Sequence, residues 1–152
     1  AIESHSRLLI NTSLAIEIAK VVDDDGLGHF QQTAFGGFGL PVEMSSFFLS
    51  DAFVALPGTA LFVGYADGQP CATAALVATG DVAGVYWVAT LEEFRGRGFG
   101  AAMTSAVLAE GGRQGCTVGS LQASALGRSV YEKMGFMQDR EYACFDATAA
   151  RD

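Results

Sequence analysis

The chain has 152 residues and a formal net charge of -8, from 17 acidic and nine basic side chains. Its length suits one domain with one core, and because half of its residues are apolar, composition gives no case for disorder. An acidic surface repels a phosphate backbone, so a nucleic-acid partner is not expected.

The N-terminal segment gives no sign of export or membrane insertion. Residues 1–13 begin with Ala and lack the basic and apolar regions of a signal peptide, and no apolar run reaches the roughly 18 residues that span a membrane. We interpret 1–13 as an extra strand, an N-terminal extension or a remnant of upstream sequence, and 14–152 as a single domain. Three widely spaced cysteines favour reduced thiols. A cytoplasmic protein with no membrane partner is therefore predicted.

The first part of the domain predicts one strand and two helical stretches. Residues 14–22 could be helix or strand by pattern, and their Ile and Val content, followed by the Asp23–Gly26 break, favours a strand. Apolar residues recur at helical spacing over 27–38, although glycines at 26, 28, 36 and 37 weaken this helix. Pro41 opens a second helical stretch.

The segment from residue 60 predicts a three-strand meander. Its apolar runs, 61–67, 71–79 and 82–90, are separated by turn signals at Asp67-Gly68 and Gly80-Asp81. A helix over 101–112, stopped by two glycines, and a strand over 117–123 follow.

The C-terminal part predicts a short helix and further strands. The helix covers 125–134, with Leu126, Val130 and Met134 as its buried stripe, and 137–148 supplies one or two last strands. The order of elements predicts a mixed sheet with helices packed on it.

The most informative segment is Arg95-Gly96-Arg97-Gly98-Phe99-Gly100, between an apolar strand and an amphipathic helix. Glycines let the backbone approach a ligand closely, and the free amides and the dipole of a helix's first turn attract phosphate groups. The segment therefore indicates a phosphate-bearing cofactor. The alternative is a glycine-rich turn that binds nothing.

Two other nucleotide motifs fit this segment less well. Gly96-x-Gly98-x-x-Ala101 satisfies the relaxed dinucleotide fingerprint, but Val118–Ser124 lacks the acid that would hold the ribose. The Gly-Lys-Ser or Gly-Lys-Thr ending of a nucleoside-triphosphate loop does not occur either. A dinucleotide-binding reductase is therefore disfavoured.

The sequence resembles the GCN5-related N-acetyltransferase (GNAT) family in two motifs. Arg95, Gly98 and Gly100 fit its acetyl-CoA signature of Arg or Gln, two residues, Gly, one residue, and Gly or Ala. Residues 130–136 resemble the family's helix that ends in Tyr-Glu-Lys-Leu-Gly-Phe. The resemblance covers about 14–148 and implies an α/β (α+β) fold. Its mixed, mostly antiparallel sheet would have six to seven strands with helices on both faces, as in a GNAT-like acyl-CoA N-acyltransferase.

The resemblance implies acetyl-CoA (coenzyme A) as the cofactor. In the family the strand before the signature splays from its parallel neighbour at a bulge, where backbone groups bind the pantetheine arm. Here these would belong to Val88, Ala89 and Thr90. The pyrophosphate would rest on amides of the loop and first turn: Arg95, Gly96, Arg97, Gly98, Phe99, Gly100 and Ala101. Ser129 is also expected to bind the cofactor. Arg128 and Lys133 would either reach the adenosine phosphate or be solvated.

The resemblance also implies direct transfer of an acetyl group to a primary amine. Tyr131 matches the tyrosine near the CoA sulfur, where a phenol with a pKa near 10 could protonate the departing thiolate; the alternative is a ring packed on the sheet. Many relatives carry Asn seven residues before that tyrosine, whereas Ser124 stands here; its hydroxyl could still donate to cofactor or acceptor. Because 82–90 contains no acid, the alternatives for deprotonation are water held by carbonyls, Ser124 or Tyr86, or an amine that arrives neutral.

The acceptor is expected at an aromatic surface. Phe35 and Phe38 correspond to the family's acceptor-lining region, and Tyr86 is counted with them; the alternative is that the phenylalanines are core. An aromatic wall on an acidic half-molecule suits a small-molecule or peptide amine with an apolar body. No metal site is predicted, because neither His5 nor His29 has a second ligand at metal spacing. The alternative function is a non-catalytic acyl-CoA-binding or regulatory module, and a homodimer is one assembly to test.

Overall fold

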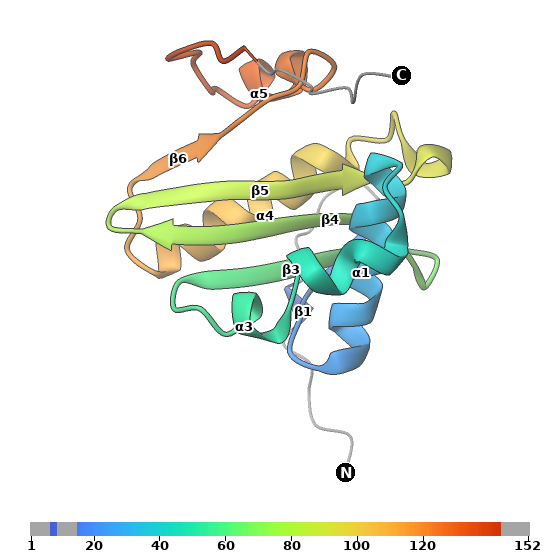
Figure 1. Ribbon diagram of the computed structural model, residues 1–152. Coiled ribbons are helices and arrows are strands. Elements are labelled where there is room, and N and C mark those ends of the chain that lie inside the picture. Colours follow the sequence, from blue (N-terminus) through green and yellow to red (C-terminus); the bar gives the residue numbers. More distant parts are fainter. Residues whose placement is uncertain (1–6, 9–14, 144–152) are drawn as a thin grey trace, which may run out of the picture. The chain divides into compact units, whose positions relative to one another are not determined.

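The computed structural model describes residues 7–8 and 15–143 (Figure 1). The chain divides into two compact units, 1–122 and 123–152. The single domain expected over 14–152 stays a prediction.

The first unit is built on one sheet with the strand order β1-β2-β3-β4-β5-β6. The first five strands are antiparallel neighbours, and β6 pairs parallel with β5. The mixed, mostly antiparallel sheet of six to seven strands is therefore confirmed, at six. The strands are β1 (Arg7–Leu8), β2 (Glu17–Lys20), β3 (Thr59–Ala66), β4 (Gln69–Thr79), β5 (Val82–Thr90) and β6 (Val118–Leu121).

The turns of the meander lie where the sequence predicts them. Asp67 and Gly68 join β3 to β4 with φ angles of 50° and 77°, the backbone that a two-residue hairpin of this kind requires. Gly80, with φ 59°, begins the turn between β4 and β5. Both turns are therefore confirmed.

Two long helices cover opposite faces of the sheet (Figure 1). On β3, Leu61 and Val63 belong to the core beneath α1 (Asp24–Phe38), whereas Phe62 belongs to the core beneath α4 (Phe99–Arg113). This alternation follows from the two-residue period of a strand. Helices on both faces are therefore confirmed.

The glycines of α1 allow close packing. A Cβ atom on Gly37 would lie 2.9 Å from the Cβ of Ala89 and 3.3 Å from the backbone N of Thr90. Only glycine lets the helix come this close to β5, so a residue that weakens the helix in isolation improves its fit to the sheet. The helix runs for 15 residues despite its glycines.

The second predicted helical stretch is broken into three short pieces. They are η1 (Val42–Met44), α2 (Ser45–Phe48) and α3 (Asp51–Val54), and a further short turn, η2 (Glu92–Phe94), follows β5. The helix predicted over 101–112 is confirmed as α4, which passes through both stop glycines to Arg113. The strand predicted over 117–123 is confirmed as β6.

The second unit contains the helix α5 (Arg128–Lys133), which is shorter than predicted. The predicted buried stripe is wrong for Leu126, which is 93% exposed, and Val130 is 38% exposed. Residues 137–143 form no strand, because they lack a strand partner among the described residues; 144–148 lie outside them. Within the described ranges, no helix has the length and apolar character needed to cross a membrane.

Candidate functional site

The N-terminus of α4 has open backbone amides. Gly98 precedes the helix with φ 78°, in the left-handed region that favours glycine, and Gly96 has φ 75°. No side chain among the described residues caps this helix, and its first turn holds no acid. The first amide with a partner is that of Ala102, which donates to the Gly98 carbonyl at 3.1 Å. The preceding amides, from Phe99 to Ala101, are left for water or a ligand.

The side chain of Arg95 connects the glycine-rich loop to two other elements. Its Nη2 atom donates to the carbonyl oxygen of Gly37 at 2.8 Å, and its Nε atom donates to that of Thr90 at 3.1 Å. Arg95 thereby joins the last turn of α1 to the end of β5. Arg97, whose guanidinium lies 5.3 Å from the centroid of the Phe94 ring, donates to the Glu93 carbonyl at 3.4 Å.

The strand before the loop contains a bulge. Thr73 pairs with Ala89 and Ala75 pairs with Tyr86, so that two residues of β5, Trp87 and Val88, lie opposite one residue of β4. Trp87 has φ 52°, which is unusual for any residue but glycine.

The bulge lies just beyond the point where β5 loses its parallel neighbour. The register of β5 with β6 ends at the pair Val85 and Leu121, whereas β5 continues to Thr90. The predicted pantetheine-binding residues, 88–90, all belong to this second half of β5. A Cβ atom on Gly100 would lie 3.9 Å from Val88 Cγ1, so the bulged half-strand and the open helix start are neighbours.

Aromatic rings surround the bulge on the α1 face. Trp87 stacks on Phe35 with centroids 5.5 Å apart and receives the edge of Phe38 at 5.8 Å. Phe48 extends the cluster, 6.3 Å from Phe35, and Phe47 contacts Phe48 at 5.3 Å. No sequence pattern identified Trp87 as part of the site, since a strand pattern does not predict a positive φ at a tryptophan.

The three predicted acceptor residues differ in exposure. Phe35 is 1% exposed, so its ring is part of the core and offers no open surface to an acceptor. Phe38 and Tyr86 are 49% and 53% exposed. Phe35 supports the rings of Trp87 and Phe48 from the core side.

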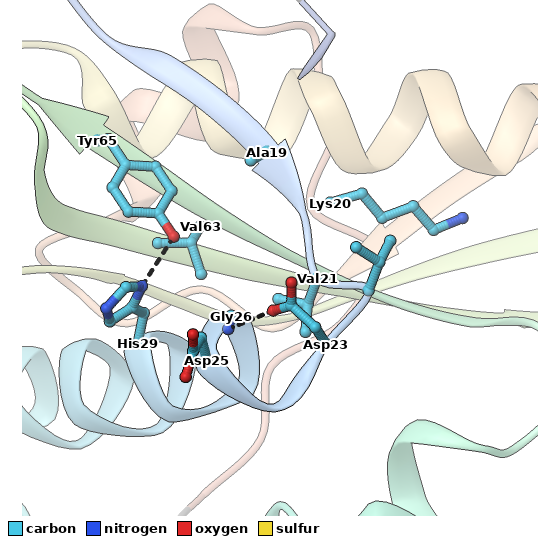
Figure 2. A pocket seen from close by; sticks show the side chains of 10 residues that line it. Ala19, Lys20, Val21, Asp23, Asp25, Gly26, His29, Val63 and Tyr65 are labelled. Atoms are coloured by element: carbon cyan, nitrogen blue, oxygen red, sulfur yellow. Dashed lines mark hydrogen bonds between the residues drawn. The ribbon is translucent and has the colours of Figure 1, made fainter. Parts of the chain in front are cut away.

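A cavity of about 180 Å³ lies at the N-terminal end of α1, and none of the predicted site residues lines it (Figure 2). On its wall the His29 Nδ1 atom and the Tyr65 hydroxyl are 3.0 Å apart. Burial raises the pKa of Tyr65, and the charges of Asp23 and Glu17 raise it further. No group of three His, Cys, Asp or Glu side chains in the described ranges could hold a metal ion.

The buried thiol of Cys71 is unsuited to nucleophilic chemistry. Burial raises its pKa to about 11, and its Sγ atom donates to the Gly64 carbonyl at 3.3 Å. Cys116 is also a free thiol, and Cys144 lies outside the described residues.

The predicted catalytic side chains belong to the second unit. The Ser124 hydroxyl accepts a hydrogen bond from the Gly127 amide at 3.2 Å, and the Tyr131 ring packs edge-on against Phe136 with centroids 6.0 Å apart. Ser129 lies on the same helix and is exposed. Arg128 pairs with Glu132 at 2.7 Å. The roles of these residues in a reaction stay predictions.

Comparison with known proteins gives one family and several similar folds. The family model described as acetyltransferase (GNAT) domain matches residues 57–138, more than half of the chain. A structure of the aminoglycoside N-acetyltransferase AAC(6')-Iy with a CoA-based bisubstrate analogue aligns with a TM-score of 0.73 and 18% identity, covering 88% of this chain and 99% of that one. No curated protein matches the sequence.

Two further structures show the same fold. An acetyltransferase from Trypanosoma brucei has a TM-score of 0.70 at 17% identity, over 87% of this chain and 99% of that one. Glucosamine-6-phosphate N-acetyltransferase from Arabidopsis thaliana has a TM-score of 0.67 at 17% identity, over 88% and 99%.

Proposed function

The chain belongs to the GNAT acetyltransferase family, and on this premise we propose that it transfers an acetyl group from acetyl-CoA to a primary amine by direct attack. The observation that carries the proposal is the open N-terminus of α4 beside the bulged half of β5. Enzymes of this family use acetyl-CoA, and structures of a similar fold carry CoA or a CoA-based analogue.

The residues present fit the cofactor's anionic part. A pyrophosphate needs several converging amides and no competing carboxylate, and the start of α4 provides both conditions. The space beside position 100 is open, because a Cβ atom there would meet nothing closer than 3.9 Å. The guanidinium of Arg95 bonds two carbonyls of this chain, so we assign it to holding the loop and the amides to binding phosphate.

The second half of β5 binds the pantetheine arm and the thioester, not the pyrophosphate. Acetyl-CoA supplies an activated acyl group, and backbone groups of Val88, Ala89 and Thr90 bind the pantetheine arm and polarise the thioester carbonyl. The acceptor nitrogen forms a bond to the acyl carbon as the carbon–sulfur bond breaks. The Tyr131 phenol donates its proton to the departing sulfur, Ser124 donates a hydrogen bond to cofactor or acceptor, and water removes the surplus proton from the amine.

The exposed aromatic surface supports an acceptor with an apolar body. Phe38, Phe48 and Tyr86 are each about half exposed, and Phe38 contacts the Trp87 ring directly. An arylalkylamine would bury its ring on this surface and present one nitrogen for attack, whereas a sugar with several amino groups would bury little apolar area here. We expect kcat/KM for such an amine to exceed that for an amino sugar by about tenfold or more, and Phe38→Ala to remove the difference.

The test of the function combines calorimetric titration with acetyl-CoA and a thiol-release assay against arylalkylamines, polyamines, amino sugars and peptide N-termini. Tight binding with turnover is expected, and Tyr131→Phe lowers kcat by about tenfold or more because it lacks the acidic proton. Binding without turnover on every amine would favour the non-catalytic acyl-CoA module. Absence of binding would overturn the proposal.

A further inference from the structure

Trp87 has a backbone conformation that needs support from its surroundings. Its φ of 52° lies in the left-handed region, which residues with a side chain rarely adopt. Such conformations persist only where neighbours over-determine them, and they concentrate at functional sites. The position is also the first residue of a bulge, which is usually glycine when φ is positive.

One neighbour fixes the backbone of this residue directly. The hydroxyl of Thr73 on β4, a fully buried residue, donates to the carbonyl oxygen of Trp87 at 2.9 Å. No pair of the β4–β5 register includes Trp87 or Val88, and the Thr73 side chain provides a hydrogen bond between the two strands at this point.

The same bond determines where the next amide points. Peptide bonds are planar, and the described chain contains no cis peptide, so the carbonyl of Trp87 and the N–H of Val88 point in opposite directions from one peptide plane. Because the carbonyl is held toward β4, the Val88 N–H is directed to the other edge of β5. On that edge β6 no longer pairs, since the register ends at Val85.

Two aromatic rings of α1 hold the side chain of Trp87 in place. Phe35 stacks under Trp87 with an interplanar angle of 17°, and Phe38, one turn further along α1, contacts it edge-on. Phe35 is itself buried, so the indole rests on a rigid core residue. The peptide that follows Trp87 is thus held through both its carbonyl and the preceding side chain.

We propose that Thr73 is a positioning residue for acyl transfer: its hydroxyl orients the Trp87–Val88 peptide so that the Val88 N–H donates to the thioester carbonyl of bound acetyl-CoA. This inference rests on the proposed function. The Thr73 side chain thus affects the rate of the chemical step from β4, without contact with either substrate.

The experiment compares Thr73→Val, which keeps the shape and loses the donor, with Thr73→Ser, which keeps the donor. We expect Thr73→Val to lower kcat by about tenfold or more, because a misdirected amide stabilises the developing charge less well. The Kd for CoA, which has no acetyl carbonyl, changes by less than about threefold in both variants, and Thr73→Ser retains kcat within about threefold. If Thr73→Val does not fold, Thr73→Ala and Thr73→Ser give the same comparison.

Two spectroscopic readouts separate positioning from packing. The infrared carbonyl band of bound, carbon-13-labelled acetyl-CoA lies lower than that of the free thioester in the wild type and in Thr73→Ser, and returns toward the free value in Thr73→Val. Trp87 is the chain's single tryptophan, so its fluorescence reports the bulge in the absence of ligand. We expect Thr73→Val, but not Thr73→Ser, to change its emission.

Each outcome is decisive. Equal losses of kcat in Thr73→Val and Thr73→Ser, or a carbonyl band unchanged in Thr73→Val, would overturn the positioning role while leaving the enzyme in place. A wild-type protein that binds no acetyl-CoA would instead overturn the proposed function, and this inference with it.

Discussion

Helices α1 and α4 have 15 residues each and cover opposite faces of the same sheet, yet their N-termini differ. The side chain of Asp23 accepts from the Gly26 amide at 2.8 Å, and two more acids occupy the first turn of α1. At the start of α4, glycine replaces the capping side chain and the first turn holds no acid. In α1 the chain's own carboxylates balance the positive end of the helix, whereas in α4 an external anion can do so.

The two helices are alike where they meet β5. Each has a glycine whose added Cβ atom would collide with the strand: Gly37 would meet Ala89 at 2.9 Å, and Gly111 would meet Ala83 at 2.5 Å. The chain therefore uses glycine both to bring helices close to the sheet and to open one helix start to a ligand. Abundant glycine here reflects packing and binding together.

The largest effect is expected from a substitution that places an acidic side chain in the first turn of α4, which makes its N-terminus similar to that of α1. Gly100→Asp places a carboxylate in its first turn, where a side chain has room. The helix gains up to about 1 kcal/mol of stability from its dipole, while the carboxylate repels the pyrophosphate. We expect the Kd for acetyl-CoA to rise about a hundredfold, which is about 2.7 kcal/mol, as the free energy of unfolding increases.

Gly100→Ala is the matched control, because it adds the Cβ atom without the charge. Its Kd should stay within about fivefold of the wild type, since the nearest atom to the new methyl group is 3.9 Å away. Calorimetry measures both Kd values. An equal loss of affinity in the two variants would show that the added side-chain volume, and not the charge, weakens cofactor binding.

The converse change removes the cap of α1. Asp23→Ala leaves the Gly26 amide without its acceptor and should lower the free energy of unfolding by about 1 kcal/mol. The Kd for acetyl-CoA should not change, because this helix start binds no cofactor. Asp23→Asn, a cap of similar strength, should retain most of the stability in urea unfolding. A weakened Kd in Asp23→Ala would mean that the two helix starts are not independent.

The sequence was sufficient to predict the meander, both hairpin turns, α4 and the glycine loop. Each depends on local chemistry, such as a positive φ at Gly68 or the two-residue period of a strand. The loop signature also located the open helix start correctly. These features need no knowledge of what lies across the fold.

The features that the sequence could not predict depend on tertiary contacts. The length of α1 despite its glycines follows from its fit to Ala89 and Thr90, and the positive φ of Trp87 from support by Thr73 and the α1 aromatics. The guanidinium of Arg95 bonds a carbonyl 58 positions earlier in the chain. The signature identifies Arg95 by its position, but it carries no information about the carbonyl groups that its guanidinium contacts.

The smallest predicted effect concerns the other end of α4, which is held by charge. Glu110 accepts from Lys20 of β2 at 2.9 Å and from Arg113 at 2.7 Å. Burial raises the pKa of this carboxyl, but hydrogen bonds from Lys20, Arg113 and Gln114 outweigh that effect and lower it to about 2. The ionised form is thus favoured in the folded protein relative to the unfolded chain, whose carboxyl has a pKa of 4.5.

Stability from a lowered carboxyl pKa is fully present above the unfolded value and is lost as the pH falls toward the folded value. Glu110→Gln should therefore lower the free energy of unfolding by about 0.5 kcal/mol near pH 7, a figure reduced because the partners are partly exposed. The difference from the wild type should shrink between about pH 5 and pH 2. Urea unfolding at several pH values measures it, with Kd for acetyl-CoA as the control. A difference that is constant with pH would show that Glu110 acts through packing, and a changed Kd would show that the charged end of α4 is coupled to its open end.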